Sequence, residues 1–438
     1  MRISVIGTGY LGATHAVALA SWGHDVVGID TNPDRIEALR HGRAPFHEPG
    51  FQALLDDGLR LGRLDFDTAV ERAVDAEVHF LCVGTPQQAG SHAADLTALH
   101  AAVETLAPLL SRPCLVVGKS TVPVGTAVQL RDRIRDLAPV GDGVQLAWNP
   151  EFLREGHAVE DSLKPDRLVF GVERDEDDQV LRAAYAPAIS QGVPVVRTDL
   201  ATAELAKVSA NVMLAARISL VNLLAEMCEE ARADVADLRR ILGLDARIGD
   251  RFLNPGIGYG GGCLPKDTRA FAARAEELGL GAPAALLREV DALNMRQRSR
   301  TIDLAVDLVG GSPVGARIGV LGAAFKADSD DVRDSPALDV AATLRARGAD
   351  VRVYDPRAGA TAARAVPDLD VVETVDDALR DADLVMVLTD WEEFRSLDPV
   401  AAVALVRAPR VIDGRLVLDP DKWRAAGWQL RALGRGAA

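Results

Sequence analysis

The stretch Arg2-Ile-Ser-Val-Ile-Gly-Thr-Gly-Tyr-Leu-Gly12 decides the fold. Its apolar run, residues 2–6, leads into a glycine turn, and a helical pattern follows over 13–22. A second apolar run, 25–29, ends at Asp30. Strand, glycine turn, helix, strand and acidic residue follow one another as in the first βαβ unit of a doubly wound dinucleotide-binding sheet.

Each glycine of this turn has a separate purpose in that fold. Gly7 permits the tight turn, Gly9 lets a pyrophosphate approach the backbone, and Gly12 lets the helix pack on the sheet. A carboxylate at Asp30 binds ribose hydroxyls and repels a 2′-phosphate, so the sequence predicts NAD rather than NADP. An ordinary glycine turn is the alternative, and a lone GxGxxG would not exclude it, but the full context favours the cofactor site.

The α/β alternation continues to about residue 200, and polar residues follow its strands. Because ligands of a doubly wound sheet bind at the carboxyl ends of its strands, these residues are candidates for a site. Each alone could equally serve a turn or a helix cap. The strands are expected at 78–83, 115–119, 145–148, 168–172 and 193–196, and the polar residues after them are Thr85, Thr121, Glu151 and Glu155.

Residues 201–308 form a helical middle section whose long helices suggest a dimerisation element. The first helix, 201–233, carries Lys207 and Asn211 four residues apart, so the two share one face. Its neighbouring turns are largely apolar, and a lysine buried among them needs a partner. A lysine that snorkels to the surface is the alternative. Further helices are expected at 234–242, 268–278 and 283–308.

Between these helices lies a loop, 247–267, with five glycines between Gly256 and Gly262. A lone thiol, Cys263, stands near its end and is followed by Lys266 and Asp267. A nearby cation favours the nucleophilic thiolate, and a nearby carboxylate can handle protons or water. A structural glycine turn with a buried, inert cysteine is the alternative.

A linker at 310–313 precedes a second parallel sheet that lacks the glycine fingerprint. Lys326, Arg333 and Arg415 follow its strands, and in so acidic a chain such residues suggest an anionic ligand. Solvated surface charge is the alternative. Strands are expected at 317–321, 351–354, 384–388 and 410–412, a helix over 336–347, and a frayed tail at 434–438.

Composition limits the partners of the chain. Its 438 residues carry a net charge of −15, which argues against nucleic acid and anionic membranes. The four cysteines match no zinc pattern and no disulfide framework, so we expect a reduced, cytoplasmic protein. Cys82 and Cys114 lie in apolar runs and are expected in the core. No signal sequence and no apolar run of membrane-spanning length are seen.

Eight motifs in order resemble the UDP-glucose/GDP-mannose dehydrogenase family over residues 1 to about 430. They are GTGYLG (7–12), VGTP (83–86), STVPVGT (120–126), NPEFLREG (149–156), ELAKVSAN (204–211), RIGDRFLNPGIGYGGGCLPKD (247–267), GAAFKADSDDVRDSP (322–336) and IDGR (412–415).

The resemblance implies the fold class: two Rossmann-like doubly wound parallel-sheet domains joined by a long-helix central dimerisation section. The expected domains are an NAD-binding domain, 1–200, a central helical domain with the cysteine loop, 201–308, and a nucleotide-sugar-binding domain, 309–438. A homodimer or a higher oligomer is implied. No metal is expected.

The resemblance also assigns roles to residues. Cys263 would be the nucleophile, and Lys207 and Asn211 would hold the sugar 6-oxygen and stabilise an oxyanion. Water and protons would be handled by Glu151, Thr121 and Asp267. The implied cofactor residues are Gly7, Gly9, Tyr10, Leu11, Gly12, Asp30, Arg35, Thr85, Thr121, Glu155, Lys266 and Arg333. The implied substrate residues are Glu151, Phe152, Leu153, Glu155, Lys207, Asn211, Arg247 (into the neighbouring subunit), Phe252, Asn254, Tyr259, Gly260, Lys326 and Arg415.

The expected reaction is the NAD-dependent four-electron oxidation of UDP-glucose to UDP-glucuronate through a thiohemiacetal and a thioester on Cys263. The same chemistry on GDP-mannose or a thymidine nucleotide sugar is an alternative, and a non-catalytic sensor of NAD or nucleotide sugar is another. The family commonly has serine before the cysteine and phenylalanine after it, where this chain has Gly262 and Leu264. These two departures blur the choice of sugar.

Overall fold

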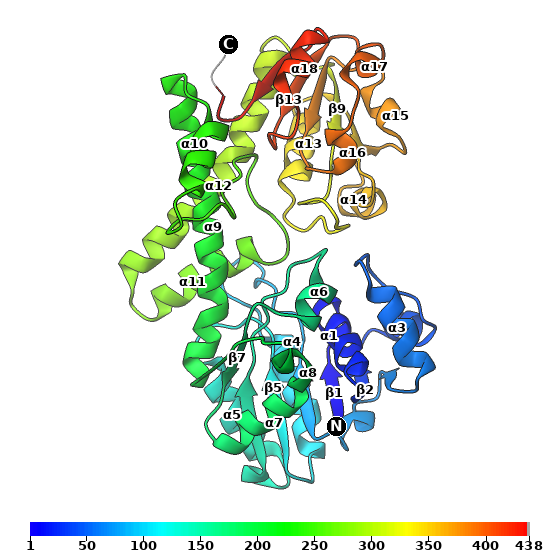
Figure 1. Ribbon diagram of the computed structural model, residues 1–438, viewed down its shortest axis with the longest axis vertical. Helices are drawn as coiled ribbons and strands as arrows, with labels where there is room; N and C mark the ends of the chain where they lie inside the picture. Colours follow the sequence, from blue (N-terminus) through cyan, green and yellow to red (C-terminus); the bar gives the residue numbers. More distant parts are fainter. Residues whose placement is uncertain (436–438) are drawn as a thin grey trace. The chain divides into compact units, whose positions relative to one another are not determined.

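The structure, a computed structural model, describes residues 1–435 (Figure 1). It divides into two compact units, one made of Met1–Ala210 and Ala273–Gly279, the other of Asn211–Ala272 and Leu280–Ala438. Two helices, α9 (Leu200–Ala231) and α11 (Leu264–Glu277), contribute residues to both units. The bounds expected for three domains stay a prediction.

The first unit is built on an eight-stranded sheet of order β3-β2-β1-β4-β5-β6-β7-β8. The strands from β3 to β6 are parallel, as predicted, but β7 runs antiparallel to β6, and β8 is parallel to β7. The last two strands therefore point their carboxyl ends the other way. The strands are β1 (Arg2–Ile6), β2 (Asp25–Ile29), β3 (Leu64–Asp67), β4 (Val78–Leu81), β5 (Cys114–Gly118), β6 (Val144–Trp148), β7 (Leu168–Gly171) and β8 (Val195–Thr198).

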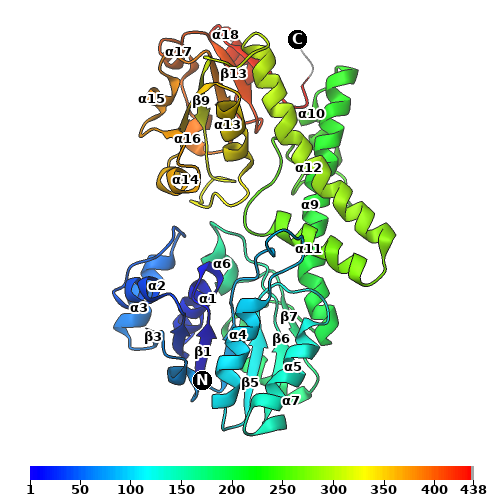
Figure 2. The same ribbon diagram turned by 180° about the vertical axis from the view of Figure 1, so that it is seen from behind.

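Helices cover both faces of this sheet, and its central strands β4 and β6 are therefore buried along their whole length. On one face α1 packs against α3 and α6, and elsewhere α5 packs against β6 beside α4 (Figure 2). The helices are α1 (Tyr10–Ser21), α2 (Pro33–Arg40), α3 (Phe51–Arg60), α4 (Thr97–Leu106), α5 (Thr126–Leu137), α6 (Ala158–Leu163), α7 (Asp175–Ala184) and α8 (Ala186–Ser190).

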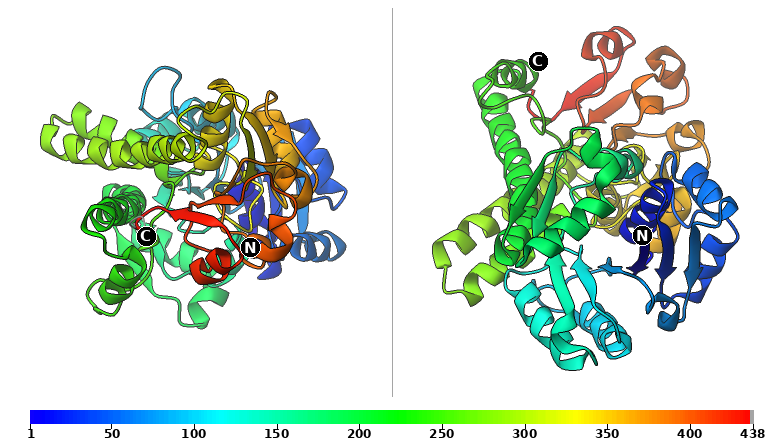
Figure 3. Two further views of the ribbon diagram at one scale, coloured as in Figure 1. Left: turned by 90° about the horizontal axis from the view of Figure 1, so that it is seen from above. Right: turned by 60° about the horizontal axis from the view of Figure 1, so that its bottom comes forward.

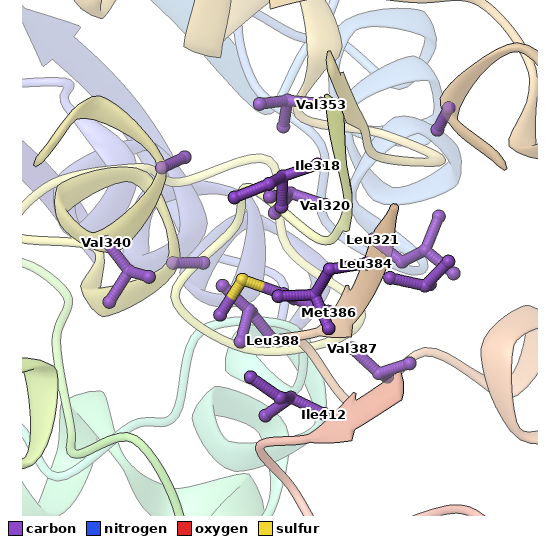
Figure 4. Packing of buried hydrophobic residues seen from close by; sticks show 14 of the residues in the cluster. Ile318, Val320, Leu321, Val340, Val353, Leu384, Met386, Val387, Leu388 and Ile412 are labelled. Atoms are coloured by element: carbon purple, nitrogen blue, oxygen red, sulfur yellow. The ribbon is translucent and has the colours of Figure 1, made fainter. Parts of the chain in front are cut away.

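The second unit contains a six-stranded parallel sheet of order β11-β10-β9-β12-β13-β14. Figure 4 shows its core, where Ile318 and Val320 on one strand meet Leu384 and Met386 on the next. All four side chains are fully buried, so this sheet has a hydrophobic core of its own. The strands are β9 (Arg317–Leu321), β10 (Asp350–Tyr354), β11 (Asp370–Val371), β12 (Leu384–Val387), β13 (Arg410–Asp413) and β14 (Gln429–Ala432).

Two long helices, α9 and α12 (Gly281–Leu308), cross each other, and the left view of Figure 3 shows α9 nearly end-on and α12 across it. Ser219 Oγ donates to the Val290 carbonyl at 2.8 Å, and Arg300 Nη2 donates to Glu229 Oε2 at 2.6 Å further along both helices. The other helices are α10 (Val235–Gly243), α13 (Pro336–Ala346), α14 (Gly359–Ala365), α15 (Val375–Leu379), α16 (Glu392–Arg395), α17 (Pro399–Val403) and α18 (Pro420–Ala425).

Helix α9 is long and apolar enough to cross a membrane by length and composition alone, with a mean hydropathy of 1.6 in its most apolar window. The expectation that no apolar run reaches that length was therefore wrong. This evidence is weak, because the core helix of a globular domain passes the same test. Glu204 and Lys207 on this helix are buried and bonded to the chain, which fits a helix packed within the protein.

Three further expectations need correction. Residues Leu264–Asp267 are not loop but the first turn of α11, because proline is accommodated in a first helical turn. Strands β3, β11 and β14 were not predicted, since their short sequences alternate with polar residues. Of the tail expected to fray, Gly434 is buried and donates to Glu229 Oε1 at 2.6 Å, and residues 436–438 lie outside the described part.

The end of β5 supports a stability prediction. A Cβ on Gly118 would lie 2.0 Å from the ring of Trp148, which is itself 1% exposed on β6. We expect Gly118→Ala to cost about 1–3 kcal/mol through overpacking and to lower the unfolding temperature measured by calorimetry. Gly281→Ala is the matched control, because its Cβ would meet nothing within 4 Å, and an equal loss in both variants would contradict the assignment.

Candidate active site

The glycine turn of the first unit has the shape that a dinucleotide requires. Gly7 has φ +91°, and a Cβ on Gly12 would lie 1.8 Å from the Gly7 carbonyl oxygen, so both positions need glycine. A Cβ on Gly9 would meet nothing within 4 Å, which leaves open space beside the backbone. No side chain of the described residues caps α1, so its first N–H groups face that space. The residues present therefore fit NAD.

Asp30 fixes this turn. Its buried carboxylate accepts from Thr8 N at 2.8 Å and from Asn32 N at 2.9 Å, and so ties the glycine turn to the end of β2. Arg35 Nη1 donates to the same carboxylate at 2.8 Å. A guanidinium that would otherwise attract a phosphate is thereby neutralised.

The carboxyl ends of β4, β5 and β6 are joined by side-chain hydrogen bonds. Thr85 Oγ1 donates to the Thr121 carbonyl at 2.7 Å, and Ser120 Oγ donates to the Val83 carbonyl at 2.7 Å. Gly118 pairs with Trp148 at the last position of β5 and β6, and Thr121 and Glu151 each follow their strand by three residues. Side chains from three strands thus stand at one edge of the sheet.

Glu151 forms a buried ion pair with Lys207 on α9. Lys207 Nζ lies 2.9 Å from Glu151 Oε1, and the two side chains are 4% and 10% exposed. The other carboxylate oxygen accepts from Leu153 N at 2.7 Å. Phe152 lies between Glu151 and Leu153 in the sequence. Two cations lie over its ring: Lys207 Nζ is 5.8 Å and the Arg167 guanidinium carbon 3.8 Å from the ring centre. Lys207 is therefore buried, not snorkelling.

Glu204, one turn before Lys207, was not predicted as part of this region. Its carboxylate accepts from Gly125 N at 2.8 Å and from Ala127 N at 2.6 Å, and so caps α5 from another helix. Burial raises the pKa of Glu204 above its usual value. The residue fixes the 121–127 turn against α9, and no local sequence signal indicates a partner nearly 80 residues away.

Glu48 is a second unpredicted residue, and it links three segments. Gly156 N donates to Glu48 Oε2 at 2.8 Å and to the Tyr10 hydroxyl at 3.0 Å, while the Tyr10 hydroxyl itself donates to Glu48. Burial and this carboxylate raise the pKa of Tyr10 above its usual range. The glycine turn is thereby tied to the segment that carries Glu151 and Glu155.

In the second unit, Cys263 stands at the N-terminal cap of α11. Its carbonyl accepts from Asp267 N at 2.9 Å, the first helical hydrogen bond of that helix. The side chain is partly exposed. A helix N-terminus favours a negative charge, and so favours a thiolate at this position.

Asp267 lies one turn into α11 and is 2% exposed. Its two oxygens accept from Asn211 Nδ2 at 2.6 Å and from Lys266 Nζ at 2.5 Å. Asn211 in turn lies one turn after Lys207 on α9, so the two share a helix face. A carboxylate with both oxygens bonded is well placed to orient the amide of Asn211.

The other three cysteines are poor nucleophiles. Burial raises the pKa of Cys82 to about 12 and that of Cys114 to about 11, and it also raises the pKa of Cys228. A thiol that stays protonated is a weak nucleophile. Of the two cysteines expected in the core, Cys82 is buried but Cys114 is only partly buried, and Cys228, for which no expectation was made, is buried. Of the four thiols, Cys263 alone combines exposure with a helix N-terminus.

The glycine loop before Cys263 is packed against its own unit. A Cβ on Gly258, at φ +99°, would lie 2.6 Å from Asn294 Oδ1, and one on Gly262 would lie 2.4 Å from the Arg333 guanidinium. Asn294 also bonds both backbone groups of Tyr259, at 2.8 and 3.0 Å. Asn294 was not predicted. The glycines therefore serve close packing, and serine at Gly262 would require Arg333 to move.

The basic residues of this unit differ in how they are placed. Arg415 donates to the carbonyls of Gly258, Leu388 and Phe325, at 3.0, 2.9 and 3.4 Å, so it ties the glycine loop to the sheet, and burial lowers its pKa. Arg247 is exposed and bonded to Asp245. Of the remaining predicted residues, Tyr259 and Gly260 are buried in the loop, Phe252 and Asn254 are exposed, Lys326 lies 5.6 Å from the Phe325 ring, and Arg333 pairs with Asp331.

Comparison with known proteins identifies the chain. Three models of one family match in order: the NAD binding domain at residues 1–189, the central domain at 201–296 and the UDP binding domain at 319–420. The chain belongs to the UDP-glucose/GDP-mannose dehydrogenase family. It is an NAD-dependent dehydrogenase, and the family and cofactor predictions are confirmed.

Relatives align over the whole length. A UDP-glucose 6-dehydrogenase of Rhizobium meliloti is 38% identical over 99% of this chain and 100% of its own, and one of Haloferax volcanii is 40% identical over 95% and 97%. A solved UDP-glucose dehydrogenase of Pyrobaculum islandicum has a TM-score of 0.92 at 37% identity, covering 100% and 98%. A UDP-D-ManNAc dehydrogenase of Pyrococcus horikoshii has 0.89 at 28%, covering 100% of both. The predicted fold class is confirmed.

The Asp30–Arg35 pair generates a prediction about the cofactor. Asp30→Asn keeps an acceptor for the Thr8 amide but removes the charge that neutralises Arg35. We expect the specificity constant for NADP relative to NAD to rise about tenfold or more, because Arg35 then faces a 2′-phosphate. The measurement is kcat/KM for both cofactors. The gain should vanish in Asp30→Asn/Arg35→Ala, and an unchanged ratio in the single variant would refute this reading.

Proposed function

We propose that the chain oxidises UDP-glucose to UDP-glucuronate in an NAD-dependent, four-electron reaction through covalent intermediates on Cys263. The single observation that carries the covalent route is the partly exposed Cys263 thiol at the cap of α11, one turn before buried Asp267. The sugar nucleotide is supported by the names of full-length relatives and by the UDP binding domain match.

The chemistry explains why such a thiol is needed. Oxidation of a primary alcohol gives an aldehyde, and the hydrogen that remains on its carbonyl carbon cannot leave as hydride until a nucleophile adds to that carbon. The Cys263 thiolate forms a C–S bond there and gives a thiohemiacetal; loss of hydride and a proton leaves a thioester. Water then cleaves the C–S bond, releasing the carboxylate and the thiol. When bound, NAD supplies the hydride acceptor for each oxidation.

The neighbouring residues would support each stage. Lys207 and Asn211, one turn apart on α9, would hold the C6 oxygen and stabilise the oxyanion of each tetrahedral stage. Glu151, which Lys207 holds in place, would take protons from the alcohol and from water, together with Thr121. Asp267 would orient Asn211 through their 2.6 Å bond. Tyr10, Leu11, Thr85 and Glu155 would contact the cofactor, and Phe152, Leu153, Lys326 and Arg415 the nucleotide sugar.

An NADH count tests this proposal. With UDP-glucose limiting and NAD in excess, we expect two NADH per sugar at completion, followed by absorbance at 340 nm. One NADH per sugar would refute the thioester route. A strong preference for GDP-mannose, UDP-ManNAc or a thymidine sugar in a substrate panel would keep the chemistry and change the sugar.

The same assay on variants isolates the thiol. Cys263→Ser should lose complete turnover while binding of NAD and UDP-glucose, measured by calorimetry, stays nearly unchanged. Cys82→Ser is the matched control, since burial keeps that thiol protonated. Turnover at the wild-type rate in Cys263→Ser would remove Cys263 from the mechanism.

We further infer that the protein is a homodimer formed through α9, alone or within a larger assembly. Met213, Leu220 and Met227 lie seven residues apart on this helix and are 69%, 57% and 62% exposed. A seven-residue apolar repeat on one helix face is typical of helix–helix association.

All four cysteines are free, which fits a cytoplasmic protein.

Light scattering after size exclusion tests the dimer. Leu220→Glu should halve the molar mass, because a charge in that stripe opposes association. Leu61→Glu is the matched control, as Leu61 is 59% exposed and is not part of the α9 stripe. A wild-type monomer, or a dimer that survives Leu220→Glu, would contradict the assignment.

A further inference from the structure

Lys119 is a buried lysine of the first unit, directly after β5, that the reaction described above does not use. It is 7% exposed and donates from Nζ to Asn149 Oδ1 at 3.1 Å and to the Tyr185 hydroxyl at 3.2 Å. The Tyr185 hydroxyl donates to the same Asn149 oxygen at 2.5 Å, and Asn149 Nδ2 donates to the Val169 carbonyl at 3.0 Å. These bonds close a buried polar cluster.

The strand register shows what this cluster holds. Gly118 pairs with Trp148, so Lys119 and Asn149 are the first pair beyond the two strands, and their side chains bond each other. Two residues further on each chain come Thr121 and Glu151. The Lys119–Asn149 bond therefore joins the two segments two residues before Thr121 and two residues before Glu151.

Burial of an ammonium group is costly, so a lysine kept here needs a reason. Burial lowers the pKa of Lys119 to about 8, and the charged groups that act on it are Cys82, Glu151 and Lys207. Tyr185 completes its surroundings through the hydroxyl bond. An apolar residue of similar length would fill the space without that cost. The lysine is thus explained by its bond to Asn149.

We propose that Lys119 is a positioning residue of the reaction, which holds Asn149, two residues before Glu151, in place and so fixes where the Glu151 carboxylate stands. This inference rests on the proposed function. Because a displacement of about 1 Å can cost about 100-fold in rate, loss of this cross-link should lower kcat.

The test compares Lys119→Met with the wild type in the full-length enzyme. We expect kcat with UDP-glucose to fall about tenfold or more and KM for NAD to change by less than about twofold. Tyr185→Phe keeps Lys119 and its bond to Asn149, so kcat should stay within about twofold of the wild-type value. Lys164→Met, at an exposed lysine, is the control for charge alone.

The outcomes separate the two proposals. A wild type inactive on UDP-glucose but active on another nucleotide sugar would refute the proposed substrate, and the comparison is then made with that sugar. An active wild type with unchanged kcat in Lys119→Met would overturn the role of Lys119. So would a fall in kcat matched by an equal rise in KM for NAD. Lys119→Gln keeps a hydrogen-bond donor and should retain more of kcat than Lys119→Met; if Lys119→Met does not fold, Lys119→Gln is compared with the wild type, and a kcat in Lys119→Gln equal to that of a Lys119→Leu variant would overturn the role as well.

Discussion

The buried ion pair between Glu151 and Lys207 is the interaction on which the arrangement of the first unit depends. Both side chains are at most 10% exposed, and removal of one partner from such a pair typically costs about 3–5 kcal/mol. The end of β6 must therefore stay within hydrogen-bond reach of α9. Glu204 adds a second bond one turn earlier, to the turn after β5. The rotation and height of the first turns of α9 are fixed by these two carboxylates.

The fold followed from sequence because its signals are local. The glycine turn, the alternating strands and the helix periodicity all lie within windows of about 30 residues, and the structure places the strand ends of β4 to β6 where parallel pairing requires. The reversed direction of β7 has no such signal, since a buried strand has the same composition in either direction. Glu48 and Asn294 were missed for the same reason: their partners, Gly156 and Tyr259, lie 108 and 35 residues away.

The glycines of the cysteine loop are required by close neighbours within the protein, which the sequence alone does not show. The glycine density of this loop indicates an irregular backbone near a ligand, but the structure shows neighbours that require glycine: the Gly414 carbonyl at Gly256, Asn294 at Gly258 and the Arg333 guanidinium at Gly262. A loop was expected up to Asp267, yet α11 already begins at Leu264, because its first turn accepts Pro265. That one change turns Cys263 from a loop residue into a helix cap and gives its thiol a favourable field.

Net charge and local charge lead to opposite expectations here. The chain carries −15 overall, which alone would disfavour an anionic nucleotide sugar. Around the end of β6, however, two lysines are buried: Lys207 pairs with Glu151, and Lys119 bonds Asn149 and Tyr185. Charges removed from water act more strongly than the many screened pairs on the surface. Under the proposed mechanism an oxyanion would form beside Lys207, where a buried cation acts on it more strongly than screened surface carboxylates do. The net charge of the chain therefore does not decide the charge of its ligand.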